Sequence, residues 1–121
     1  MFINLVKEQD YDLVIPTYYN VDFLDDIGDK PFVLTVYDMI HEIFPQHFAD
    51  DKTTVPNKKM LIEKATKIIA ISESTKADIL KFYPEINPSK IEVVYLSHSI
   101  SLNNLSTVSL PKNYILFVGN R

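Results

Sequence analysis

The chain has 121 residues, 46% of them hydrophobic and 23% charged, which are ordinary values for a globular protein and exclude a disordered or fibrous chain. Its formal net charge of −4, without a cluster of Lys and Arg, argues against a nucleic-acid partner. Because it has no cysteine, a disulfide framework, a thiolate metal site and a cysteine nucleophile are excluded, and we expect a cytoplasmic location.

The amino-terminal residues 1–8 do not have the pattern of a targeting segment. They lack a basic region, and they become charged at Lys7 and Glu8, which is too early for a signal peptide. No apolar stretch approaches the roughly 20 residues that a membrane-spanning helix needs. We therefore expect a soluble chain.

Five short runs rich in β-branched residues occur along the chain, at residues 12–15, 32–37, 67–71, 91–95 and 114–118. Their apolar residues are nearly continuous rather than alternating with polar ones, which is typical of parallel strands covered on both faces. Helical patterns lie between them, at residues 56–66 and 73–82. Strands and helices therefore alternate, and we predict an α/β fold with a Rossmann-like parallel sheet and flanking helices.

Capping residues define the second helix better than the first. Ser72 is its expected N-cap, and Pro84 follows its end. A single turn at residues 87–90 begins with Asn87 as its cap. The polar residues 97–111 lack periodicity and form the best candidate for a linker.

The densest cluster of titratable groups, which contains Tyr37, Asp38, His41 and Glu42, follows the second predicted strand. Working residues of α/β proteins gather at the carboxyl ends of strands. The alternative is that Asp38 caps the next turn, that His41 and Glu42 are solvated and that their apolar neighbours pack, and the residues alone favour it. A zinc site is not supported, because His41 and His47 lack the required spacing.

Two further segments offer groups to a ligand. Ser72, Glu73 and Thr75 lie at a helix N-terminus, which can hold a phosphate or a sugar hydroxyl, although N-capping alone is sufficient to explain them. Tyr18 and Tyr19 follow the first predicted strand, where an aromatic ring either stacks on a sugar or completes the core. With only two glycines, the chain contains no glycine-rich phosphate loop.

Together, the segments "VLTVYDMIHEIFPQHF", "KATKIIAISESTKADILKFYPEINPSKIEVVYLS" and "NYILFVGNR" resemble the central part of family 4 glycosyltransferases. These enzymes have the GT-B fold, in which two Rossmann-like domains face each other across a cleft. The resemblance covers nearly all of the chain and implies a fragment. Residues 1–96 would then be the C-terminal half of the acceptor-side domain, residues 97–111 the interdomain linker, and residues 112–121 the first strand of the nucleotide-sugar-binding domain.

The resemblance also implies roles for the site residues. Asp38 matches the aspartate of the family's His-Asp element, Tyr37 stands where many members have histidine, and His41 is close enough to substitute for it. Asp38 and His41 are therefore the expected catalytic residues. The expected acceptor-side cleft residues are Tyr37, Glu42, Ser72, Glu73 and Thr75.

Gly119 and Arg121 match the start of the loop that binds the donor diphosphate. The implied reaction is sugar transfer from a nucleotide-diphosphate sugar to a glycan or lipid-linked acceptor with retention of configuration, without a metal or other cofactor. Its usual context is bacterial surface polysaccharide synthesis by a cytoplasmic enzyme, with peripheral contact to the inner membrane left open. We expect no transferase activity from these residues alone.

Two alternatives stay open at this point, a non-catalytic Rossmann-like α/β module and an inactive truncated gene product. The strand edges that a truncation leaves bare also predict self-association of the isolated chain, because unpaired edges recruit other strands.

Overall fold

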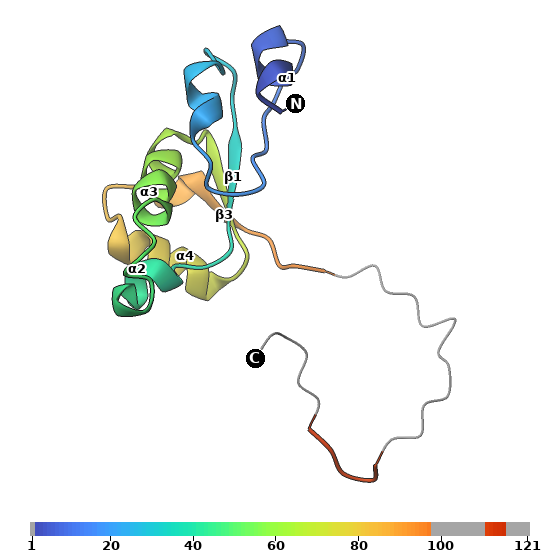
Figure 1. The fold of residues 1–121 in the computed structure, drawn as a ribbon, viewed down its shortest axis with the longest axis vertical. Coiled ribbons are helices and arrows are strands. Elements are labelled where there is room, and N and C mark those ends of the chain that lie inside the picture. Colours follow the sequence, from blue (N-terminus) through green and yellow to red (C-terminus); the bar gives the residue numbers. More distant parts are fainter. Residues whose placement is uncertain (1, 98–110, 116–121) are drawn as a thin grey trace.

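The computed structural model describes residues 2–97 and 111–115 (Figure 1). Within them, three strands, β1 (Val33–Val36), β2 (Lys67–Ala70) and β3 (Ile91–Val93), form a sheet in the order β1-β2-β3. Both neighbouring pairs are parallel. Val14 forms an isolated parallel bridge to Phe32, so the segment around Val14 runs beside β1 in the same direction.

The helical elements of the described residues are α1 (Phe2–Glu8), η1 (Asp22–Asp25), α2 (Ile40–Ile43), η2 (Pro45–His47), α3 (Thr54–Lys64), α4 (Glu73–Phe82) and η3 (Pro88–Lys90), where η denotes a 3-10 turn. The connection from β1 to β2 contains α3, and the connection from β2 to β3 contains α4. Helical connections of this kind are what parallel strands require. The mixed α/β fold with a small parallel sheet and flanking helices is therefore confirmed.

One face of the sheet is buried along most of its length. Leu34, Val36, Ile68, Ala70 and Ile91 on this face are at most 1% exposed, and Val93 at the end of β3 is half-buried. They belong to one hydrophobic core with residues from the helices, among them Leu61 and Ile62 of α3 and Ile79 of α4.

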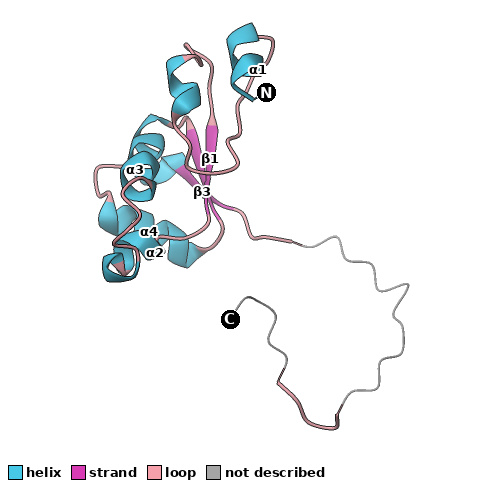
Figure 2. Cartoon of the chain, viewed as in Figure 1, coloured by secondary structure: helices cyan, strands magenta, loops and turns pink. Residues whose placement is uncertain are grey.

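The opposite face is only partly covered. Thr35 and Ile69, which are partners in neighbouring strands, are half-buried, and Glu92 beside them is exposed. The expectation that both faces are covered is therefore wrong for the described residues. Right-handed connections between strands in consecutive order place their helices on one side of the sheet, and Figure 2 shows α3 and α4 on the same side of the strands.

Local sequence signals located most of these elements. β1, β2, β3 and η3 lie within or at their predicted ranges, and α4 has the predicted bounds. Ser72 caps α4 as expected, because its Oγ accepts a hydrogen bond of 3.1 Å from the Thr75 amide. Asn87 caps η3 by accepting from the Ser89 amide at 2.9 Å.

Other expectations need correction. The predicted strand at residues 12–15 is reduced to the single bridge at Val14. Helix α3 starts at Thr54, two residues before the predicted range, and it ends at Lys64, two residues before the predicted end. The sequence patterns also missed α1, η1, α2 and η2, which are too short to establish a helical period.

The predicted fifth strand and linker fall mainly outside the described residues, and the domain boundaries stay predictions. Tyr114 and Ile115 are described and exposed, and they belong to no strand. In the described ranges, no helix has the length and apolarity needed to cross a membrane.

Candidate functional site

The carboxyl ends of β1 and β2 bring two predicted site segments together. Tyr37 and Asp38 directly follow β1, and Ser72 follows β2 by one residue before α4 begins. The Thr75 hydroxyl in the first turn of α4 donates to the Tyr37 carbonyl oxygen at 3.4 Å. This contact joins the two segments, which are 38 residues apart in sequence.

Asp38 is half-buried and has one structural bond. Its Oδ1 accepts a hydrogen bond of 3.2 Å from the Ile40 amide, so Asp38 does cap the turn that leads into α2. Its Oδ2 has no hydrogen-bond partner in the part of the chain that the structure describes. One carboxylate oxygen therefore remains for a ligand.

Ser72 and Thr75 are engaged mainly with each other. Besides the bond from the Thr75 amide, the two hydroxyl oxygens lie 3.0 Å apart. Thr75 is buried, whereas Glu73 is exposed. Of the acceptor-side residues predicted on α4, Glu73 is thus the one that faces solvent.

Glu42 is not solvated, which corrects the structural alternative considered for it. Its side chain is 4% exposed, and its Oε2 accepts a bond of 2.9 Å from Nζ of the fully buried Lys58. Its Oε1 accepts from the Tyr83 hydroxyl at 3.3 Å. Because both oxygens are paired inside the protein, Glu42 supports the site from within and does not line its surface.

Lys58 lies next to the candidate site and was not identified from the sequence. Its Nζ also donates to the Asp38 carbonyl oxygen at 3.1 Å, and it lies 4.9 Å from the centre of the Tyr19 ring. The helical register held the signal, because Lys58 precedes the buried Leu61 and Ile62 by three and four residues and so shares their face. Lys58 therefore ties α3 to the Asp38 segment.

Two tyrosines next to this ion pair are held in the neutral form. Burial raises the pKa of Tyr83 well above its ordinary value, and the charge of Glu42 acts in the same direction. Burial likewise raises the pKa of Tyr19, although the Tyr37 amide acts in the opposite direction. The Tyr19 hydroxyl has no well-formed hydrogen bond within the described residues.

His41 contacts Asp51, and no hydrogen bond or ion pair joins it to Asp38 in the described part of the chain. Its Nε2 lies 3.5 Å from Oδ2 of Asp51, and its ring contacts the Phe48 ring with 4.0 Å between centres. Asp51 in turn accepts hydrogen bonds from the Thr53 and Thr54 amides at the start of α3. Hydrogen bonds from Thr54 and Thr53 also hold the pKa of Asp51 well below its usual range.

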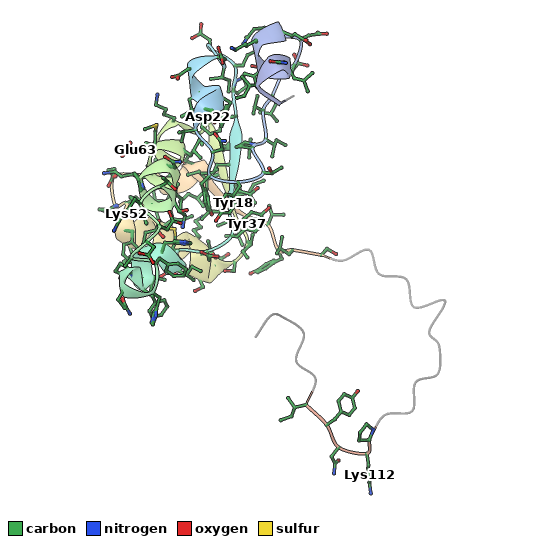
Figure 3. The ribbon with its side chains drawn as sticks, in the orientation of Figure 1. Tyr18, Asp22, Tyr37, Lys52, Glu63 and Lys112 are labelled. Carbon is green, nitrogen blue, oxygen red and sulfur yellow. The ribbon has the colours of Figure 1, made fainter. Side chains whose placement is uncertain are left out.

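Tyr18 and Tyr19 were each considered either for stacking on a sugar or for completing the core, and the structure separates them. Tyr19 is 7% exposed and belongs to the core, whereas Tyr18 is 59% exposed. Tyr18 and Asn20 stand between two cavities, one of about 440 Å³ and the other of about 280 Å³, and line both. Figure 3 shows Tyr18 on the loop before η1 and Tyr37 at the end of β1.

The expected donor-binding residues Gly119 and Arg121 lie outside the described residues, so their role stays a prediction. Among the residues that are described, no group of three or more His, Asp or Glu side chains could hold a metal ion. No protein-family model matches the chain, and no curated protein matches it.

Proposed function

We propose that the chain is part of a retaining glycosyltransferase, a GT-B enzyme that transfers a sugar from a nucleotide-diphosphate sugar to a glycan or lipid-linked acceptor in bacterial surface polysaccharide synthesis. One observation carries the proposal. The Asp38 segment and the capped tip of α4 meet at the carboxyl edge of a parallel sheet, joined by the 3.4 Å contact between Thr75 and Tyr37. This edge is where open α/β sheets bind their ligands.

Exposed apolar and aromatic side chains at the same edge support the proposal. They follow three of the four parallel segments and comprise Ile15, Tyr18, Tyr37, Val94, Tyr95 and Leu96. Each is at least 42% exposed. Gathered apolar groups of this kind mark a ligand groove or an interface, and in a GT-B enzyme this edge would face the donor domain.

Within this proposal, the residues of the edge take different parts. Asp38 acts on the acceptor hydroxyl, because its free Oδ2 can accept that hydroxyl's hydrogen bond. His41 faces Asp51 in this structure, so it contributes only after its ring turns. Tyr37 and Glu73 contact the acceptor, while Glu42, Ser72 and Thr75 hold the edge in shape.

In this proposal, the residues at the end of the sequence bind the donor diphosphate. Negative charge builds on the diphosphate as it leaves, and a preorganised Arg stabilises such charge best in a site that excludes water. Arg121 fits this role, and Gly119 allows the diphosphate to approach the backbone. The reaction needs no metal or cofactor in this proposal.

A non-catalytic α/β module is the second candidate, and a specific observation favours it. Asp38, Ser72 and Glu42 all have structural hydrogen bonds, which alone could account for their presence. The reading frame after the Arg121 codon tests the enzyme against both alternatives, the non-catalytic module and the inactive truncated product. A lysine within several residues and a distant acidic pair would support the enzyme, whereas a stop codon there would favour an inactive truncated product.

Calorimetric titration of the 121-residue chain with common nucleotide sugars tests the assignment of residues 1–96 to the acceptor-side domain. We expect no binding, because most of the donor site would lie on residues after Arg121. Specific binding of a nucleotide sugar would contradict the assignment of these residues to the acceptor side.

A further inference from the structure

The smaller cavity beside Tyr18 has the lining of a sugar site. It lies between the loop that follows Val14 and the first turns of α3, and has a volume of about 280 Å³. Its lining includes Tyr18, Tyr19, Asn20, Asp22, Thr53 and Asn57. This volume lies just below the roughly 300 Å³ at which the range for ligand pockets starts, and the hollow is open to solvent, so a single small ring is the largest suitable occupant.

Several polar atoms of this cavity have no protein partner among the described residues. Asn20 uses its Oδ1 to accept from the Asp22 amide at 2.7 Å, which leaves its side-chain N–H groups free. Asn57 uses its Nδ2 to donate to the Tyr19 carbonyl at 3.1 Å, which leaves its Oδ1 free. The Asp22 carboxylate also has no hydrogen-bond or ion-pair partner among the described residues. The cavity therefore presents amide donors, an amide acceptor and a carboxylate together.

The bonds that Asn20 and Asn57 do make hold the cavity in shape. The bond from Asn57 joins α3 to the loop that contains Tyr18 and Tyr19, 38 residues away in sequence. The bond to Asn20 fixes the start of η1. Tyr18 leans on the Tyr19 ring, with 4.9 Å between centres and 45° between planes, while 59% of its surface stays exposed. An aromatic ring held in this way offers a firm face to a ligand.

The charges of the lining exclude some ligands. None of the described residues that line the cavity is Lys, Arg or His, so an anion such as phosphate would find no cation there and would be repelled by Asp22. An aromatic face with neutral amides and one carboxylate suits a polyhydroxylated ring, whose hydroxyls donate to the carboxylate and accept from the amide.

We propose that this cavity binds a neutral pyranose unit, with Tyr18 stacked on the sugar ring, Asp22 and Asn57 accepting from its hydroxyls, and Asn20 donating to them. The proposal deepens the proposed function, on which it rests for identifying the sugar as part of the acceptor. Figure 3 labels Tyr18 and Asp22, which both lie on the segment between α1 and β1. Residues at the start of α3 line the same cavity.

Nuclear magnetic resonance of the labelled 121-residue chain tests the site. The probes are the methyl glycosides of glucose, galactose, mannose and N-acetylglucosamine, with tetramethylammonium and inorganic phosphate as competing chemistries. We expect at least one glycoside to cause saturable shifts at Tyr18, Asn20 and Asn57, and neither ion to do so. Binding of tetramethylammonium or phosphate alone, or no binding at all, would overturn the proposal.

Variants give the matched comparison. Tyr18→Ala should weaken glycoside binding about fivefold, which corresponds to one lost aromatic contact, whereas Tyr18→Phe should keep it. Asp22→Asn should weaken it about tenfold, because a hydrogen bond to a charged acceptor is lost. Tyr114→Ala removes a tyrosine outside the cavity with a similar exposure, 53% against 59% for Tyr18, and should not change glycoside binding. Equal effects of Tyr18→Ala and Tyr114→Ala would contradict a site at Tyr18.

The failure of this site and the failure of the proposed function give different results. Glycoside binding at Tyr18 without sugar transfer by the full reading frame would keep the sugar site and refute the transferase. Sugar transfer with glycoside shifts confined to other residues would keep the transferase and refute the site.

Discussion

Removal of the buried charge of Lys58 should destabilise the protein severely. In Lys58→Met, the long apolar stem remains, but the ammonium group is lost. Its loss leaves Oε2 of Glu42 and the Asp38 carbonyl oxygen without their donor in a region where Lys58 is fully buried and the Glu42 side chain is 4% exposed. The variant therefore isolates the ion pair from the packing of the side chain.

The magnitude follows from the burial of both partners. Breaking a buried pair by removal of one charge costs about 3–5 kcal/mol, because the other charge stays buried without compensation. A small domain loses about 4–8 °C in melting temperature per kcal/mol, so the midpoint should fall by at least about 12 °C. Thermal unfolding followed by circular dichroism measures this change, and urea unfolding gives the free energy directly.

Lys59→Met is the matched control on the same helix. Lys59 is 54% exposed and pairs with Glu63 at 3.8 Å, so its removal should change the unfolding free energy by less than about 0.5 kcal/mol. The double variant Lys58→Met, Glu42→Leu should recover part of the loss, with a coupling energy of about 1–3 kcal/mol. Equal stabilities of Lys58→Met and Lys59→Met would show that the buried ion pair does not stabilise the fold. A double variant whose loss is the sum of the two single losses would show that Lys58 and Glu42 are not coupled.

Three further predictions concern the caps and the titrating groups. Ser72→Ala should lower the unfolding free energy by about 1 kcal/mol in urea unfolding, because the Thr75 amide loses its acceptor, whereas the exposed Ser74→Ala should have almost no effect. Burial raises the folded-state pKa of Tyr83 and Tyr19, so the contribution of the two neutral phenols to stability should be constant below about pH 10 and be lost above it. Absorbance at 295 nm should show that these two phenols ionise only as the chain unfolds. In Tyr83→Phe, the fall in stability above about pH 10 should be shallower. Hydrogen bonds lower the folded-state pKa of Asp51, so the contribution of its carboxylate to stability should be present above about pH 4 and be lost as the pH falls below it. If the melting temperature of Asp51→Asn depends on acid pH in the same way as that of the parent chain, this prediction is wrong.

The fold was predictable where local chemistry decides it. The β-branched runs and the Ser72 and Asn87 caps are signals within a few residues, and the structure places β1, β2, β3, α4 and η3 accordingly. Local sequence did not predict how much of residues 12–15 pairs as a strand, because the pairing of an edge strand depends on how far its neighbour extends beside it. Only Val14 finds a partner there.

The candidate site was predictable in position and not in its contacts. The parallel order of the strands was enough to expect Asp38 and Ser72 at one edge. The burial of Glu42 against Lys58, and the turn of His41 toward Asp51, depend on tertiary packing between segments that lie 10 to 16 residues apart in sequence, which no local pattern encodes. The split between Tyr18 and Tyr19 is of the same kind, because it depends on where α3 packs.

The most direct test of the central proposal is sugar transfer by the protein expressed from the full reading frame that encodes residues 1–121. Transfer of radiolabelled sugar from a panel of nucleotide sugars to lipid-linked and glycan acceptors is measured, with the anomeric configuration of the product determined by nuclear magnetic resonance. We predict a retained configuration and a loss of rate of about 100-fold or more in Asp38→Ala, with the exposed Asp50→Ala unchanged. No transfer from any donor, or full activity of Asp38→Ala, would contradict the account.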